Sequence, residues 1–258
     1  MRRSLLVLFI LSLAAGSLFG QARGGGRGGA PQAPPTAKGI APFDITGYWV
    51  SVVTEDWRWR MFPNKGDFAA IPLNPEGKKI ADAWDPAKDE AAGEQCKGYG
   101  AGGIMRVPGR FHFTWQDDQT LKVESDAGTQ TRILSFGNPQ GQGGDWQGVS
   151  KSEWELAPYT GGFAFGRGTP PANRTGSLKI VTTKMKPGYV RRNGAPYSAN
   201  AVVEEYYDLV KEANGDTYLV LTMTVTDPAY LTDPMFTTAH FKKQADASGW
   251  NPTPCSAK

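Results

Sequence analysis

The segment Val202–Thr226 reads VVEEYYDLVKEANGDTYLVLTMTVT, and it contains two alternating runs on either side of Asn214-Gly215. An Asn-Gly pair between two such runs is the strongest short-range signal for a β-hairpin. In the second run one face would carry Leu219, Leu221, Met223 and Val225, and the other face mostly threonines. This segment therefore predicts two long paired strands, over residues 202–210 and 216–226.

The same period of two recurs along the chain and predicts further strands at residues 46–53, 57–61, 110–115, 121–124, 129–136, 177–185 and 236–243. One helix is expected after Asn74, which can cap it, with Pro75 at its first position and an end before Asp85. Residues 86–103 are expected to be irregular. The absence of βαβ alternation excludes nucleotide-binding α/β folds. We therefore expect a mostly β chain forming an antiparallel, closed or nearly closed barrel of about ten strands, with one short helix.

The N-terminus has the features of a secretory signal peptide. Arg2 and Arg3 precede an apolar run, residues 5–13, that is too short to span a bilayer, and Gly20-Gln21-Ala22 places small residues at a cleavage site. A retained membrane helix is the alternative. We expect residues 1–22 to be removed, no membrane insertion afterwards, and a periplasmic or secreted protein.

Residues 23–42 are rich in Gly, Pro and Arg and have little to bury, which predicts a disordered linker; an RNA-binding tail is the alternative interpretation. Loss of Arg2 and Arg3 lowers the formal net charge from +3 to +1. A nearly neutral chain does not attract nucleic acid over its whole surface, so we expect no nucleic-acid partner. Residues 43–258 are expected to form a single barrel-like domain.

Two cysteines remain in the chain, Cys96 and Cys255. An even number in an exported chain favours one disulfide. The alternatives are two free thiols or a metal site that includes His112 and His240. The spacing of these four residues matches no zinc pattern, so we expect no metal.

The motif Gly47-Tyr48-Trp49 lies at the start of the first predicted strand. It resembles the Gly-x-Trp signature of lipocalins, in which the tryptophan plugs the closed end of the barrel. This chain is longer than a simple lipocalin, and the second lipocalin signature is not evident. The resemblance implies a lipocalin-like architecture only.

A broader resemblance rests on residues 107–110, 154–155, 177–183, 194–198 and 205–207, and on Asp227-Pro228-Ala229-Tyr230 with Pro234. In these pieces the chain is similar to a large group of exported bacterial β-rich proteins with no known activity. Two features depart from that group: Tyr197 stands where a histidine is often found, and a Gly/Pro-rich insert covers residues 157–175. The resemblance implies the fold and the compartment, and no particular reaction.

Three residues are candidates for acid–base catalysis. Glu205 follows Glu204 in a strand, so one of these two carboxylates faces the interior, where burial raises a carboxyl pKa. The alternative is a structural acid paired with Arg132 or Arg110. His112 and His240 lie mid-strand beside threonines, and each is either a catalytic group or a hydrogen-bonded structural residue.

A threonine-rich strand face is either a wet lumen that holds a ligand or an ordinary solvent-facing surface. For the first case, the candidates for ligand contact are Arg110, Tyr197, Tyr206, Thr222 and Thr238. The basic, aromatic segment 184–192 is a further candidate, for an anionic ligand or a carbohydrate; its alternative is a solvated loop.

These features favour an exported protein that binds a small, apolar or aromatic molecule. An enzyme (a lyase, isomerase or hydrolase) using Glu205 with His112 or His240 is one alternative, and an envelope structural or interaction module is another. The catalytic motifs Gly-x-Ser-x-Gly, His-Glu-x-x-His and Cys-x-x-Cys are all absent from the sequence. No cofactor is expected.

Overall fold

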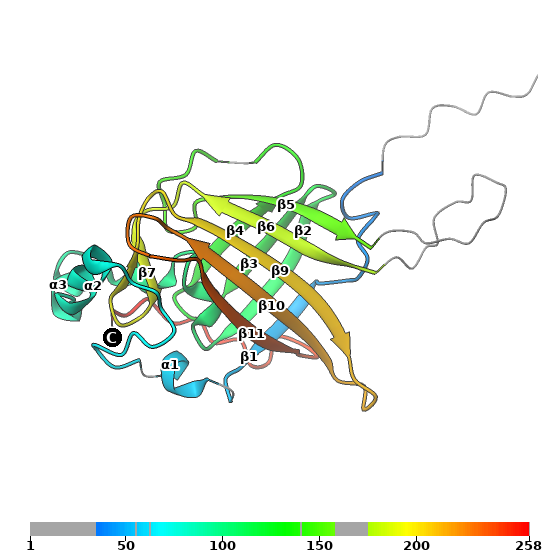
Figure 1. Cartoon of the computed structure of the whole chain (residues 1–258). Coiled ribbons are helices and arrows are strands. Elements are labelled where there is room, and N and C mark those ends of the chain that lie inside the picture. The colour runs from blue at the N-terminus through cyan, green and yellow to red at the C-terminus, as the bar shows by residue number, and fades with distance from the viewer. Residues whose placement is uncertain (1–34, 55, 62, 140, 158–174, 258) are drawn as a thin grey trace, which may run out of the picture. The chain divides into compact units, whose positions relative to one another are not determined.

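Nine strands of the described part of the chain close into one barrel, in the order β1-β11-β10-β9-β6-β5-β4-β3-β2 (Figure 1). The computed structural model describes residues 35–257 except 55, 62, 140 and 158–174, so the predicted signal peptide lies outside the described residues. The expected mostly β, closed barrel is confirmed. Its strands are β1 (Gly47–Val52), β2 (Arg110–Asp117), β3 (Thr120–Ser125), β4 (Gln130–Ser135), β5 (Val149–Leu156), β6 (Gly176–Thr183), β9 (Val202–Lys211), β10 (Thr217–Thr226) and β11 (Met235–Lys243).

The predicted hairpin is the longest paired unit of the barrel. β9 and β10 pair antiparallel from Val202↔Thr226 to Lys211↔Thr217. Gly215 has a φ of +90°, which a residue without a Cβ adopts at no steric cost. The Asn-Gly signal therefore predicted the hairpin and the place of its turn, whereas the pairing of Lys211 with Thr217 gives a loop longer than two residues.

One pair departs from the expected antiparallel pattern. β4 and β5 run parallel, with Leu134 opposite Ser150. The connection over residues 136–148 is long enough to carry the chain back along the barrel, which a parallel pair requires. The period-two signal of β5 was not recognised, because its residues alternate between serine and charged side chains rather than between apolar and polar ones.

Helices and a small sheet cover one end of the barrel (Figure 1). They are α1 (Trp57–Met61), α2 (Pro75–Asp82), α3 (Pro86–Ala91), the 3₁₀ helices η1 (Gln95–Tyr99) and η2 (Ile104–Arg106), and the strand pair β7 (Gly188–Arg191) and β8 (Ala195–Tyr197). The prediction for α2 is confirmed, since the Asn74 side chain accepts a hydrogen bond from Gly77 N at 2.8 Å and Pro75 is at the first position. The expected irregular structure over residues 86–103 is wrong, because Asp85 caps α3 and η1 follows it.

The predicted strand at residues 57–61 is also wrong, since this segment is α1. The N–H groups of Trp59 and Arg60 both donate to the carbonyl of Asp56, which forms a helical turn. Arg60 is buried and donates to the Val52 carbonyl at 2.7 Å, whereas Trp57 is 62% exposed. Five residues are too few to distinguish a period of two from one of 3.6, and the tertiary contacts of Arg60 decide the conformation.

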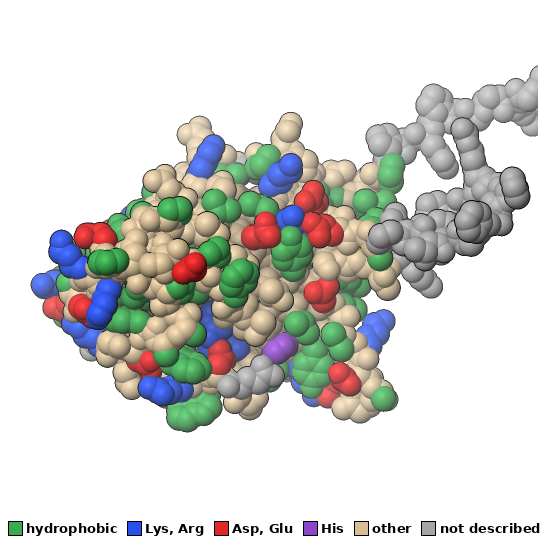
Figure 2. Space-filling view, viewed as in Figure 1, with side chains coloured by type: hydrophobic (Ala, Val, Ile, Leu, Met, Phe, Trp, Pro, Cys, Tyr) green, Lys and Arg blue, Asp and Glu red, His purple; other side chains and the backbone are tan. Residues whose placement is uncertain are grey.

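The barrel interior is packed with side chains. Trp49, Phe113, Tyr207 and Phe241 are each at most 1% exposed, and Leu219, Leu221, Met223 and Val225 point inward from β10. The threonine face of β10 and β11 lies on the outside. Charged and apolar side chains are interspersed over the outer face seen in Figure 2.

Both ends of the folded chain are held against the barrel. The described structure begins at Pro35, before the expected linker boundary, and Ala37 is buried while its carbonyl accepts a hydrogen bond from Trp154 Nε1 at 2.8 Å. Residues 35–42 therefore belong to the folded part rather than to a disordered linker. At the other end, Cys255 forms a disulfide with Cys96 of η1, as predicted.

Candidate functional site

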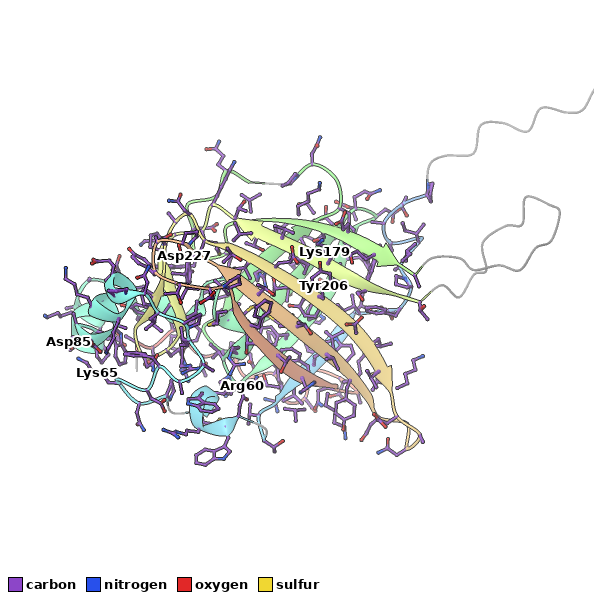
Figure 3. The ribbon with its side chains drawn as sticks, viewed as in Figure 1. Arg60, Lys65, Asp85, Lys179, Tyr206 and Asp227 are labelled. Carbon is purple, nitrogen blue, oxygen red and sulfur yellow. A yellow bond between two sulfur atoms is a disulfide. The ribbon has the colours of Figure 1, made fainter. Side chains whose placement is uncertain are left out.

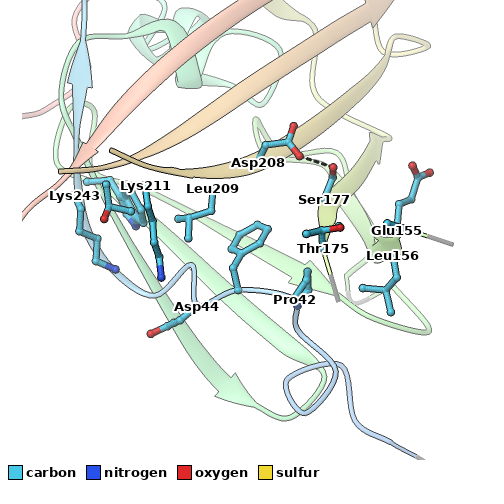
Figure 4. Close-up of a pocket in the computed structure, with 15 residues that line it drawn as sticks. Pro42, Asp44, Glu155, Leu156, Thr175, Ser177, Asp208, Leu209, Lys211 and Lys243 are labelled. Carbon is cyan, nitrogen blue, oxygen red and sulfur yellow. Dashed lines mark hydrogen bonds between the residues drawn. The ribbon is translucent and has the colours of Figure 1, made fainter. Parts of the chain in front are cut away.

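A large cavity lies at the end of the barrel opposite the helices, where β1, β6 and β10 begin and β5, β9 and β11 end. Its volume is about 1110 Å³. Figure 4 shows side chains of these strand ends, together with Pro42 and Asp44 from the segment before β1, around the opening. We call this cavity the mouth pocket. Its lining includes Phe43, Asp44, Trp49, Leu156, Ser177, Asp208, Leu209, Lys211 and Lys243.

Aromatic and aliphatic side chains form the apolar part of the mouth pocket. Trp49 is fully buried, and its indole N–H donates to the Ile45 carbonyl at 2.8 Å, which fixes the ring across this end of the barrel. Phe43 packs edge-to-face on Trp154, with ring centroids 5.4 Å apart. Leu156 and Leu209 complete the apolar surface. An apolar or aromatic molecule could bury its surface against this wall.

Two lysines and an aspartate supply charge at the same pocket. Lys243 lies over the Trp49 ring, with Nζ 4.5 Å from the centroid, and burial lowers the pKa of this lysine although Asp44 acts in the opposite direction. For Asp44, burial opposes the charge, but hydrogen bonds from Thr46 outweigh it and lower the pKa of the carboxyl. Lys211 makes no ion pair with a described residue. The mouth pocket therefore combines an apolar wall with a cationic group that is open to a ligand.

The polar residues inside the barrel form a separate, closed arrangement. Arg132 of β4 and Glu205 of β9 have side chains that are 3% and 0% exposed, and Arg132 donates to both carboxylate oxygens, at 3.0 and 2.5 Å. The Tyr207 hydroxyl also donates to Glu205, at 3.0 Å. Burial disfavours the charge of Arg132, yet Glu205 raises the pKa of Arg132 above its ordinary value. Of the two interpretations of Glu205, a catalytic acid or a structural acid paired with an arginine, this geometry fits the second, with Arg132 as the partner.

The structure does not bring the three proposed catalytic residues together. Glu205 points into the barrel, whereas His112 and His240 lie on the outer faces of β2 and β11, between inward-facing neighbours. His112 stacks on Tyr48 with ring centroids 4.0 Å apart, and its Nδ1 lies 3.4 Å from a Glu124 carboxylate oxygen. His240 is half-buried. The barrel wall separates Glu205 from both histidines.

The proposed ligand-contacting residues lie outside the mouth pocket. Tyr206 faces outward and packs beside Lys179, whose Nζ is 5.3 Å from the ring centroid (Figure 3). Thr222 and Thr238 are exposed and face each other across β10 and β11. Arg110 lies 3.8 Å from an Asp126 carboxylate oxygen. Tyr197 is buried at the helical end, where burial raises the pKa of its hydroxyl, and its ring lies against Gly102.

Sequence reasoning missed the residues that do line the mouth pocket. They come from strand ends and from the segment before β1, where an alternation pattern carries no information about contacts. The motif Gly47-Tyr48-Trp49 lies at this end of the barrel, but the lipocalin resemblance implied a closed end there and so did not indicate a pocket. Phe43 and Asp44, just before this motif, could have been placed at the same end.

Comparisons with known proteins identify no relative: no family model matches the chain, and neither the curated proteins nor the solved structures contain a match. The two resemblances seen in the sequence therefore stay predictions. Among the residues that the structure describes, no helix is long and apolar enough to cross a membrane. The same residues contain no cluster of three or more His, Cys, Asp or Glu that could hold a metal ion.

Proposed function

We propose that this chain is an exported protein that binds a small, apolar or aromatic molecule, and that the ligand occupies the mouth pocket rather than the barrel interior. The observation that carries the proposal is the cavity of about 1110 Å³ with its wall of Phe43, Trp49, Leu156 and Leu209. Ligand pockets are commonly concave, largely apolar and roughly 300–1,000 Å³ in volume. Because side chains fill the barrel interior, the proposal assigns the ligand to the pocket at this end of the barrel.

The mouth pocket suggests an orientation for the ligand. Its body would contact the apolar wall, where burial of apolar area contributes roughly 25 cal/mol per Å² before the costs of association. A polar group on the ligand would lie near Lys211 and Lys243, at the ends of β9 and β11.

The N-terminal signal motif and the disulfide support export to an oxidising compartment. Disulfides persist in the periplasm and outside the cell, and they are rare in the cytosol. N-terminal sequencing of the protein recovered from the periplasm or medium of a bacterial host tests this point. We expect the first residue of the mature protein to follow Ala22; an intact Met1 in that fraction would contradict it.

Ligand binding can be tested with N-phenyl-1-naphthylamine, a neutral aromatic fluorophore, and the mature protein. We expect saturable fluorescence enhancement, and Leu209→Arg should weaken it by at least about tenfold, because an arginine would place charge in the apolar wall. Val210→Arg is the matched control, since Val210 is the neighbouring residue on the outer face and is 39% exposed. Equal effects of both substitutions, or no saturable binding by the wild type, would refute the proposal.

The enzyme alternative has no shared site for its three residues, because Glu205 lies inside the barrel and both histidines lie outside it. A common substrate could not reach Glu205 and a histidine across the barrel wall. The interaction-module alternative stays a prediction without a site.

A further inference from the structure

A second, smaller pocket lies at the helical end, between α1 and the first residues of β11. Its volume is about 200 Å³, and Arg106 and Arg191 both line it. We call it the arginine pocket. Arg191 belongs to the basic segment 184–192 that the sequence marked as a candidate anion site, and it lies in β7. The arginine pocket shares no lining residue with the mouth pocket.

The charge of Arg191 is not matched by a carboxylate in contact. Its two terminal nitrogens donate to the backbone carbonyls of Asp67 and Ala69, each at 3.0 Å, and no described acid lies within ion-pair distance of it. Burial, together with the charge of Arg106, lowers the pKa of Arg191 to about 10, although the nearby carboxylates of Asp67 and Asp56 act in the opposite direction. A guanidinium has five N–H donors, so donors remain for a ligand.

Arg106 is in a different state, because its charge is already paired. It forms an ion pair with Asp56, and it donates to Thr237 Oγ1 and to the Thr238 carbonyl. Since Asp56 and Arg106 offset each other, the pocket keeps one positive charge, on Arg191. An anion that entered would pair with Arg191, whereas the paired Asp56 and Arg106, which both line the pocket, contribute little net charge.

The remaining wall of the arginine pocket is apolar. Arg191 Cζ lies 5.7 Å from the centroid of the Trp59 ring, and Ile71, Val190 and Met235 also line the pocket. Phe236 forms its rim and is 69% exposed, although it is a large apolar side chain. An inorganic anion would leave this apolar surface unused, whereas an organic anion would cover it.

The backbone next to Arg191 carries strain. Ala70 has a φ of +62°, in the left-handed region that a residue with a Cβ rarely adopts, and it lines the pocket directly after the carbonyl of Ala69 that Arg191 contacts. Such backbone outliers cost free energy and concentrate at ligand sites. The strained turn presents two carbonyls to Arg191 and thereby fixes the position of its guanidinium.

We propose that the arginine pocket binds a small organic monocarboxylate with a flat, apolar body. The carboxylate of the ligand pairs with Arg191, because the planar guanidinium matches the geometry of a carboxylate. The apolar body of the ligand packs between Trp59 and Phe236. The volume of about 200 Å³ limits the ligand to a compact molecule, such as one with a single ring. This site is separate from the mouth pocket, so it goes beyond the binding function proposed above.

The test uses benzoate as the probe and the mature protein from an exporting host, with binding measured by calorimetry. Arg191→Gln is expected to weaken benzoate binding by at least about tenfold, since it removes the charge that pairs with the carboxylate. Lys88→Gln is the matched control, because it also removes one positive charge, from an exposed residue of α3 that does not line the pocket. Its effect should stay within about twofold. Equal losses in both variants would overturn the proposal.

The chemistry of the ligand is tested separately. Benzamide has the shape of benzoate without its charge and should bind at least about tenfold more weakly; equal affinity would show that Arg191 is not the recognition element. Inorganic phosphate should not displace benzoate at equal concentration. Displacement would show a general anion site and overturn the assignment of an organic ligand.

A second pair of variants tests the arginine pocket even if the Arg191→Gln variant does not fold. Phe236→Ala should weaken benzoate by about threefold without changing the unfolding midpoint, because the side chain is largely exposed. Trp57→Ala is its control, since Trp57 is 62% exposed and does not line the pocket. Leu209→Arg should leave benzoate binding unchanged even where it abolishes binding at the mouth pocket, so the two proposals can fail independently.

Discussion

The disulfide between Cys96 and Cys255 allows a quantitative prediction. It closes a loop over a sequence separation of 159 residues, from η1 near the helical end to the C-terminal tail. In the chain-entropy relation, a loop of this length removes roughly 17 cal/mol/K from the unfolded chain, or about 5 kcal/mol at 25 °C. The double substitution Cys96→Ser/Cys255→Ser should lower the free energy of unfolding by about this amount.

The native tail should stay in place in that variant, because other contacts hold it. Thr253 N donates to the Asp126 carbonyl at 2.9 Å, Thr129 Oγ1 donates to the Thr253 carbonyl at 3.0 Å, and Trp250 packs edge-on against Tyr48. The loss therefore acts on the unfolded chain, which becomes more expanded without the cross-link.

Urea unfolding followed by circular dichroism measures the effect. With an m-value of about 3 kcal/mol/M, a loss of 5 kcal/mol lowers the midpoint by about 1.7 M. Reductant should produce a similar shift in the wild type and none in the double variant. A midpoint that falls by less than about 0.3 M in both the variant and the reduced wild type would refute the loop-entropy reasoning.

Three further predictions concern the described side chains. Arg132→Met should destabilise the fold by about 3–5 kcal/mol, because it leaves the Glu205 carboxylate buried and unpaired. In urea unfolding, the double variant Arg132→Met/Glu205→Leu should recover most of this loss. A double variant no more stable than Arg132→Met alone would contradict this reasoning. Asn74→Ala should cost about 1 kcal/mol through loss of the α2 cap, and an unchanged midpoint would argue against that role. The hydrogen bond from Lys97 lowers the pKa of Glu94 below its ordinary value of 4.5, so this carboxylate stabilises the fold above that pH and ceases to do so as the pH falls through the lowered value. The stability difference between wild type and Glu94→Gln should accordingly be present at neutral pH and disappear once the pH has fallen below the lowered pKa of Glu94.

The local features of this protein were readable from the sequence because they depend on neighbouring residues. The Asn214-Gly215 turn and the alternation on either side of it predicted β9 and β10 within one or two residues. Asn74 and Pro75 predicted the start of α2 for the same reason, since capping is a contact within one turn. The two cysteines of the chain predicted their own pairing, because no other thiol competes for them.

The candidate sites could not be predicted in this way. Alternation separates two faces of a strand but does not say which one is inside, and the packed interior decided that the threonines of β10 and β11 lie outside. The mouth pocket joins the ends of strands that are far apart in the sequence, and the arginine pocket joins β7 to α1 and β11.

The sequence by itself therefore determined the secondary structure wherever local periodicity, turns and caps were sufficient, and with it the mostly β class. Tertiary structure alone decided the helical state of α1, the parallel pairing of β4 with β5, the partner of Glu205 and both pockets. The physical reason is that each of these depends on contacts between residues distant in the chain. Such contacts form only once the closed barrel has brought Arg132 to Glu205 and the strand ends to one rim.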